Sequence, residues 1–97
     1  MEDRGAQRSW LARVRVLLKP SINDPQGQAI QNGLRALGFA DVVQVRAGKY
    51  FEIVIGAAHA RDAERQADEM CRKLLANPVI EDYRLEVEHH RTVGDEV

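Results

Sequence analysis

The sequence predicts an α+β fold in a single domain, with the element order β-α-β-β-α-β. Three observations support this prediction. Apolar and polar residues alternate in several short stretches, which is typical of half-buried strands. Two other stretches repeat apolar residues every three or four positions, as amphipathic helices do. Glycine, proline or asparagine lies where one period gives way to the other, so each change coincides with a turn signal.

The first strand is expected at residues 12–19, because apolar and basic side chains alternate there. Successive side chains of a strand point to opposite faces of the sheet, so one row should face the core. That row is Val14, Val16 and Leu18, and the opposite row is Arg13, Arg15 and Leu17.

The first helix is expected to begin after Asp24, whose carboxylate can accept hydrogen bonds from the free N–H groups of the first turn. Pro25 suits the first helical position, since the N–H at that position needs no partner. Gly38 can adopt the left-handed conformation that ends a helix. The apolar face of this helix comprises Ile30, Leu34 and Leu37.

The next stretch predicts a β-hairpin that turns at Ala47-Gly48-Lys49. Its alternating apolar residues are Val43 and Val45 before the turn and Phe51, Ile53 and Ile55 after it. The opposite face of the strands is also partly apolar, through Leu17, Val42, Tyr50 and Val54. A second subunit would cover such a face, so we expect dimerisation through the sheet surface.

A second amphipathic helix is expected from about residue 60, with an apolar stripe formed by Ala63, Ala67, Met70, Cys71 and Leu74. Asn77 is expected to end it in the left-handed conformation, and Pro78 prevents its continuation. The last strand is predicted from Ile80, Tyr83, Leu85 and Val87. Two right-handed crossovers then place both helices on one face of a four-stranded antiparallel sheet, the ferredoxin-like or split βαβ arrangement.

The composition indicates one globular domain, since the 97 residues are 44% apolar and 30% charged. We expect a flexible N-terminal extension at residues 1–11, the domain at residues 12–88 and a polar C-terminal tail at residues 89–97. A domain of this size has a thin core, which favours self-association. The formal net charge of −1 does not favour nucleic acid or an anionic membrane as a partner.

The location expected from the sequence is the cytoplasm. The longest apolar run is too short to span a bilayer, and the first ten residues lack the apolar segment of an export signal.

Catalytic, cofactor-binding and metal-binding residues are not expected in this chain. Cys71 lies on an apolar stripe, where desolvation disfavours a thiolate. Adjacent residues of a strand point to opposite faces, so the pair His89-His90 does not suit one metal ion. His59 stands alone, and the acidic residues are mixed with basic ones. The residues therefore indicate an oligomer-prone module without its own active site.

Three stretches, in their order and spacing, resemble the PurS family, the small subunit of phosphoribosylformylglycinamidine (FGAM) synthase. They are KPSINDPQGQAIQNGLRALGF, VRAGKYFEI and MCRKLLANPVIEDYRLEV. The resemblance covers residues 13–88, and its most specific parts are DPQG, the GK pair and LLANPVIEDY.

The resemblance implies a non-catalytic subunit of a ligase in purine biosynthesis. In this family a large synthetase subunit, PurL, binds magnesium-ATP and the ribonucleotide, and a glutaminase subunit, PurQ, releases ammonia from glutamine. The resemblance implies that this chain bridges the two as a homodimer, with a tetramer as the alternative for the isolated chain. Whether ammonia passes through this subunit stays open at this stage.

The candidate interface residues lie in the three most specific stretches. They are Asp24, Pro25, Gln26, Gly27, Arg46, Gly48, Lys49, Asn77, Pro78, Val79, Ile80, Glu81, Asp82 and Tyr83. Each also has a local interpretation: Asp24 as a helix cap, Gly48 as a turn residue with positive φ, and the basic residues as solvated charges. The alternative function is a regulatory module of the same architecture that binds a small metabolite between paired subunits.

Overall fold

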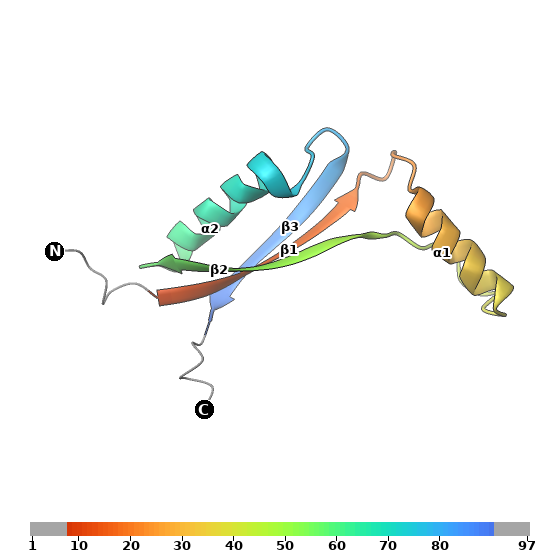
Figure 1. The fold of residues 1–97 in the computed structure, drawn as a ribbon, viewed down its shortest axis with the longest axis horizontal. Coiled ribbons are helices and arrows are strands. Elements are labelled where there is room, and N and C mark those ends of the chain that lie inside the picture. The colour runs from red at the N-terminus through yellow and green to blue at the C-terminus, as the bar shows by residue number, and fades with distance from the viewer. Residues whose placement is uncertain (1–7, 91–97) are drawn as a thin grey trace, which may run out of the picture.

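The computed structural model describes residues 8–90 and consists of a long antiparallel sheet, a helix on one of its faces and a second helix beyond its end (Figure 1). Its strands are β1 (Arg8–Leu18), β2 (Gly48–Ala57) and β3 (Glu81–His89). Its helices are α1 (Pro25–Ala36) and α2 (Ala60–Met70), and a π-helical turn at Cys71–Leu75 continues α2.

The sheet has the strand order β2-β1-β3, and β1 pairs antiparallel with both neighbours. Val14 lies opposite Phe51 on β2 and opposite Leu85 on β3. Residues that lie opposite each other share a face, so the predicted row of Val14 and Val16 does face α2, and both residues are fully buried. The predicted alternation of this first strand is confirmed.

The core between α2 and the sheet consists mainly of small side chains. Its buried residues are Ala12, Val14, Val16, Ile55, Ala57, Ala63, Ala67, Cys71 and Ala76. The largest fully buried side chains are only valine and cysteine, while several leucine, isoleucine and aromatic side chains remain exposed. The core of the single chain is therefore thin, as its length predicts.

The predicted hairpin at Ala47-Gly48-Lys49 and the strand before it are absent from the part of the chain that the structure describes. The sheet has three strands there, and β2 begins at Gly48. Side chains of α1 form hydrogen bonds with the backbone of the segment that precedes β2. Gln31 Oε1 accepts from Val45 N–H at 3.2 Å, and Arg35 Nη2 donates to Val42 O at 2.8 Å. This segment therefore follows α1 instead of pairing with β2, and Val42 is not part of a sheet face.

The prediction that both helices cover one face of the sheet is also wrong. Only α2 packs on the sheet, whereas α1 lies beyond its end, at the far right of Figure 1. The start of α1 agrees with prediction, since Asp24 is its N-cap and Pro25 its first residue. Gly38 follows it with a φ of 104°, the expected left-handed conformation.

The end of the second helix differs from prediction because the π-helical turn is wider than an α-helical one. The stripe holds at Ala63, Ala67 and Cys71, which are fully buried, but Leu74 is 83% exposed and Ala76 is buried in its place. Asn77 does not have a positive φ, so it does not end the helix in the left-handed conformation.

The first strand begins earlier than predicted, at Arg8. The indole N–H of Trp10 donates to Ala57 O at 2.9 Å, and the Trp10 ring meets the ring of His89 edge-on at 5.5 Å. These contacts anchor the first residues of β1 to both neighbouring strands. Residues 1–7 of the predicted extension and residues 91–97 of the predicted tail lie outside the described residues.

Candidate interface site

The three candidate segments, far apart in the sequence, meet at one end of the sheet. The backbone N–H of Lys19 donates to Ile80 O at 2.8 Å, which joins the loop before α1 to the loop before β3. Gly48 pairs with Leu17 and brings the start of β2 to the same place. An open cavity of about 490 Å³ lies among them, lined by Val16, Leu18, Asp24, Pro25, Gln26, Ala47, Gly48, Lys49 and Glu81.

Asp24 holds two of these segments together. Its Oδ1 accepts a hydrogen bond from Gly27 N–H at 2.9 Å, which is the predicted cap of α1. Its Oδ2 accepts from Ala47 N–H, also at 2.9 Å. The bonds from Ala47 and Gly27 lower the pKa of the Asp24 carboxyl, because N–H donors favour its charged form. The cap was predictable from the sequence, but the link to Ala47 was not.

Gly27 is the buried residue of α1 and allows a close approach of backbones. A Cβ at this position would lie 2.6 Å from Val45 O and would also collide with the Asp24 carboxylate. Glycine is thus needed in the DPQG stretch for space, since its backbone does not have a positive φ.

Arg46 and Gly48 join the start of β2 to the end of β1. Arg46 Nη2 donates to Leu18 O at 2.5 Å. A Cβ at Gly48 would lie 2.6 Å from Leu17 Cδ2 and would collide with Val16 O. The interpretation of Gly48 as a turn residue with positive φ is wrong, because it lies in a strand and its φ is not positive.

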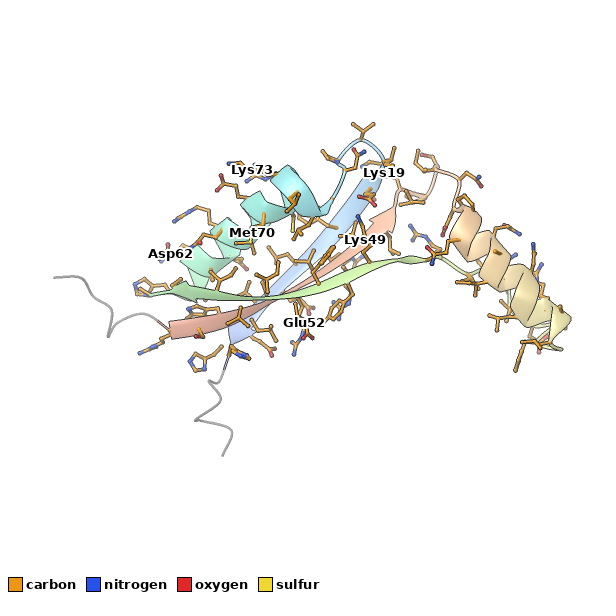
Figure 2. The ribbon with its side chains drawn as sticks, in the orientation of Figure 1. Lys19, Lys49, Glu52, Asp62, Met70 and Lys73 are labelled. Carbon is orange, nitrogen blue, oxygen red and sulfur yellow. The ribbon has the colours of Figure 1, made fainter. Side chains whose placement is uncertain are left out.

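Lys49 connects β2 to the junction at residues 75–81. Its Nζ donates to Leu75 O at 3.3 Å and lies 3.4 Å from Glu81 Oε2. Glu81 Oε1 in turn accepts from Asn77 N–H at 2.7 Å, and Asn77 Oδ1 accepts from Val79 N–H at 3.0 Å. Figure 2 shows Lys19 and Lys49 at this end of the sheet. These bonds hold the junction in one conformation and leave Val79 77% exposed.

The remaining candidates, Pro78, Val79, Ile80, Asp82 and Tyr83, do not line the cavity. Asp82 forms an ion pair with Lys19 at 2.8 Å. Tyr83 lies on the α2 side of the sheet, where its hydroxyl donates to Asp68 Oδ1 at 2.5 Å. This bond raises the pKa of Tyr83 and, together with a bond from Arg72, lowers that of Asp68. Tyr83 thus joins β3 to α2 and is not at the cavity.

No cluster of three or more histidine, cysteine, aspartate or glutamate side chains that could bind a metal ion is found within residues 8–90. Cys71 is fully buried, and desolvation raises the pKa of its thiol. No helix in the described range is long and apolar enough to cross a membrane. A second open cavity, of about 550 Å³, lies at the base of α1, and two of its polar side chains, Asp24 and Gln31, are already hydrogen-bonded to the backbone.

The family of the chain follows from comparison with known proteins. The model of the family described as PurS: Phosphoribosylformylglycinamidine (FGAM) synthase matches residues 11–89. This chain belongs to the PurS family. The match takes in every segment around the cavity of about 490 Å³.

Curated relatives agree with this assignment. The chain is 51% identical over 79 residues to the synthase subunit PurS of Bacillus subtilis, a match that covers 81% of this chain and 93% of that one. It is 48% identical over 79 residues to the PurS subunit of a Synechocystis strain, covering 81% and 79% of the two chains.

Solved PurS structures have the same fold. PurS of Methanocaldococcus jannaschii, described as one of the subunits of formylglycinamide ribonucleotide amidotransferase, superposes with a TM-score of 0.77 at 38% identity over 84% of this chain and 99% of that one. A chain of PurLQS from Thermotoga maritima gives a TM-score of 0.77 at 26% identity over 82% of this chain and 98% of that one.

Proposed function

We propose that the chain acts as the small, non-catalytic subunit of FGAM synthase in de novo purine biosynthesis. It bridges the synthetase and glutaminase subunits during the ATP- and glutamine-dependent conversion of formylglycinamide ribonucleotide to its amidine. Membership of the PurS family and the likeness to a chain of PurLQS support this role. The ligase reaction then belongs to the complex, and transfer of ammonia takes place within it.

The observation that carries the bridging role is the convergence of three sequence segments around one cavity. Asp24, Lys49 and Glu81 come from different elements, and each forms hydrogen bonds or an ion pair with another segment. Such bonds give the surface a fixed shape, and a scaffold subunit needs a fixed shape more than it needs reactive groups. The surface is therefore suited to recognition by another protein.

The proposed partners follow from this role. They are the large synthetase subunit PurL, which holds magnesium-ATP, the glutaminase subunit PurQ, and a second copy of this chain. The cofactor is expected in PurL and not in this chain. The proposed location is the cytoplasm, where the soluble substrates of purine synthesis are found.

Assembly of the complex tests the proposal directly. The synthetase and glutaminase of the same organism are mixed with or without this chain, in the presence of magnesium nucleotide and glutamine, and separated by gel filtration. We expect all three proteins to co-elute, and the two larger subunits to separate when the chain is omitted. Co-elution of the two larger subunits without it would contradict a bridging role.

A further inference from the structure

The face of the sheet away from α2, called the open face below, has neither helix of residues 8–90 packed on it (Figure 1). Residues that lie opposite each other in the register share a face. The open face therefore comprises Leu11, Arg13, Arg15 and Leu17 of β1, Tyr50, Glu52 and Val54 of β2, and Asp82, Arg84, Glu86 and Glu88 of β3. Figure 2 shows Glu52 on this side of the sheet and Met70 of α2 on the other. Charged side chains thus dominate this face.

The carboxylates of the open face already have partners within the chain. Each accepts a hydrogen bond from a neighbouring side chain, at donor–acceptor distances between 2.6 and 3.4 Å. The pairs are Arg13 with Glu88, Arg15 with Glu86, Lys19 with Asp82 and Tyr50 with Glu52. The open face therefore has no carboxylate left over for another cation.

One cation of the open face lacks such a partner. Arg84 is exposed, and no ion pair of its side chain is found among residues 8–90. It lies directly opposite Arg15 in the register of β1 and β3. Side chains in such positions have Cβ atoms about 4.5 to 5.5 Å apart, and like charges there are destabilising. An anion bound between the two arginines would offset this repulsion.

The surface around Arg15 also has the shape and composition of a contact site. The guanidinium carbon of Arg15 lies 5.8 Å from the centre of the Tyr50 ring. Both side chains line an open cavity of about 310 Å³, which shares Gly48 and Lys49 with the cavity of about 490 Å³ at the end of the sheet. Arginine and tyrosine are enriched among the residues that contribute most to protein interfaces. The open face is thus continuous with the candidate interface.

We propose that an acidic segment of a larger subunit of the complex lies on the open face, with one of its carboxylates bound between Arg15 and Arg84. A guanidinium group binds a carboxylate through two parallel N–H···O bonds, so Arg84 suits this ligand. A second copy of the chain is a poor source of the carboxylate, because those of its own open face are already paired. The inference rests on the proposed bridging function and adds the chemistry of one contact.

Binding of the full chain to each purified larger subunit, measured separately by biolayer interferometry, tests the contact. We expect Arg84→Ala to weaken binding to one of the two subunits about tenfold, and Arg84→Glu about a hundredfold, because the second variant repels the carboxylate. Arg61→Glu is the matched control, since it makes the same change of charge at an exposed position of α2, away from the open face. Its affinity should stay within about twofold of the natural value.

Salt and stability separate this role from a structural one. Added sodium chloride should weaken binding of the natural chain more than binding of Arg84→Ala, because screening acts on the charge that the variant lacks. The melting temperature of the isolated Arg84→Ala chain should not fall, since the substitution removes a like charge opposite Arg15. A fall of several degrees with unchanged salt dependence would show a structural role and would overturn the inference.

The binding data also distinguish failure of this contact from failure of the bridging role. If the natural chain binds the larger subunits and Arg84→Glu binds both as tightly, only the contact at Arg84 is refuted. A natural chain that binds neither larger subunit would overturn the contact and the bridging role together.

Cross-linking identifies the source of the carboxylate. Arg84→Lys keeps the positive charge and supplies an amine that a carbodiimide can join directly to a contacting carboxylate. The isolated variant gives the background of links within the chain and between its copies. In the reconstituted complex, mass spectrometry should find an additional link from residue 84 to an aspartate or glutamate of a larger subunit. Background links alone, in a complex that has assembled, would contradict the proposal.

Discussion

The carboxylate of Asp24 accepts a hydrogen bond from the backbone N–H of Ala47 at 2.9 Å, across 23 residues of chain. The same carboxylate caps α1 through Gly27 N–H. One side chain therefore fixes both where α1 begins and where the chain returns from it. The direction in which α1 leaves the sheet therefore depends on Asp24.

Replacement of Asp24 should lower the stability of the chain by an amount that depends on how many of its two hydrogen bonds are lost. Asparagine has one acceptor oxygen and can keep only one of the two bonds, whereas alanine keeps neither. We expect the melting temperature at neutral pH to fall by a few degrees for Asp24→Ala, as for other lost caps, and by less for Asp24→Asn. Thermal unfolding followed by circular dichroism measures both. Equal stability of Asp24→Asn and the natural chain would mean that the second bond contributes nothing.

Two glycines of α1 should respond in opposite ways to alanine. At Gly27 a Cβ would lie 2.6 Å from Val45 O, so Gly27→Ala should destabilise the chain by about 1 to 3 kcal/mol. At Gly33 nothing lies within 4 Å of the added Cβ. Gly33→Ala should therefore stabilise the helix by about 0.5 to 1 kcal/mol. Urea unfolding compares them, and a stabilising Gly27→Ala would contradict the close contact.

The bond between Tyr83 and Asp68 predicts how stability varies with pH. It lowers the pKa of Asp68, so its contribution is present above the unfolded value of about 3.9 and is lost as pH falls through the folded pKa. It raises the pKa of Tyr83, so that contribution is present below about pH 10 and is lost as pH rises through the folded pKa. Tyr83→Phe should flatten both limbs of a plot of unfolding free energy against pH.

Tyr50→Phe is the matched control for this profile. The Tyr50 hydroxyl donates to Glu52 at 2.8 Å on the opposite face of the sheet, and this bond raises the pKa of Tyr50. Its removal should change the alkaline limb but leave the acid limb of Asp68 as it is. An acid limb that is the same in Tyr83→Phe and in the natural chain would refute the assignment to Asp68.

Lys49 and Arg46 should affect assembly more than stability. Lys49 is half-exposed, and exposed ion pairs contribute only about 0 to 1 kcal/mol, so the melting temperature of Lys49→Ala should stay close to that of the natural chain. Its removal frees the junction at residues 75–81, so binding to the larger subunits should weaken about tenfold or more. Arg46→Ala should weaken this binding to a similar extent, because the start of β2 would lose its hydrogen bond to Leu18 O.

Lys73→Ala is the control, because Lys73 pairs with Glu69 along the helix and does not line the cavity. Gel filtration and turnover of the reconstituted complex are the measurements. Unchanged assembly and turnover in both Lys49→Ala and Arg46→Ala would defeat the interface assignment.

Local signals in the sequence correctly predicted the ends of α1 and the core face of β1. Asp24 and Pro25 mark the start of α1, Gly38 marks its end, and the alternation in β1 gave the correct core face. These features depend on neighbouring residues. Each can therefore be read from a few positions of chain.

The main errors concern contacts between distant residues, and one concerns the local form of a helix. Val43 and Val45 alternate like a strand, but the hydrogen bonds that Gln31 accepts from Val45 and that Arg35 donates to Val43 keep their segment beside α1. The wider π-helical turn at Cys71–Leu75 rotates Leu74 out of the core. The spacing of apolar residues in the sequence does not by itself indicate such a turn. The site residues were predicted segment by segment, whereas the bonds between segments, such as Asp24 with Ala47, needed the fold.

We propose that this chain couples the glutaminase to the synthetase, so that the ammonia from glutamine is used, without itself taking part in the chemistry. The most direct test is synthesis of formylglycinamidine ribonucleotide by the cognate synthetase and glutaminase, with and without the chain, with either glutamine or free ammonium as nitrogen source. We expect glutamine-dependent synthesis to require the chain and ammonium-dependent synthesis largely not to require it. A glutamine-dependent rate that is the same without the chain would contradict it.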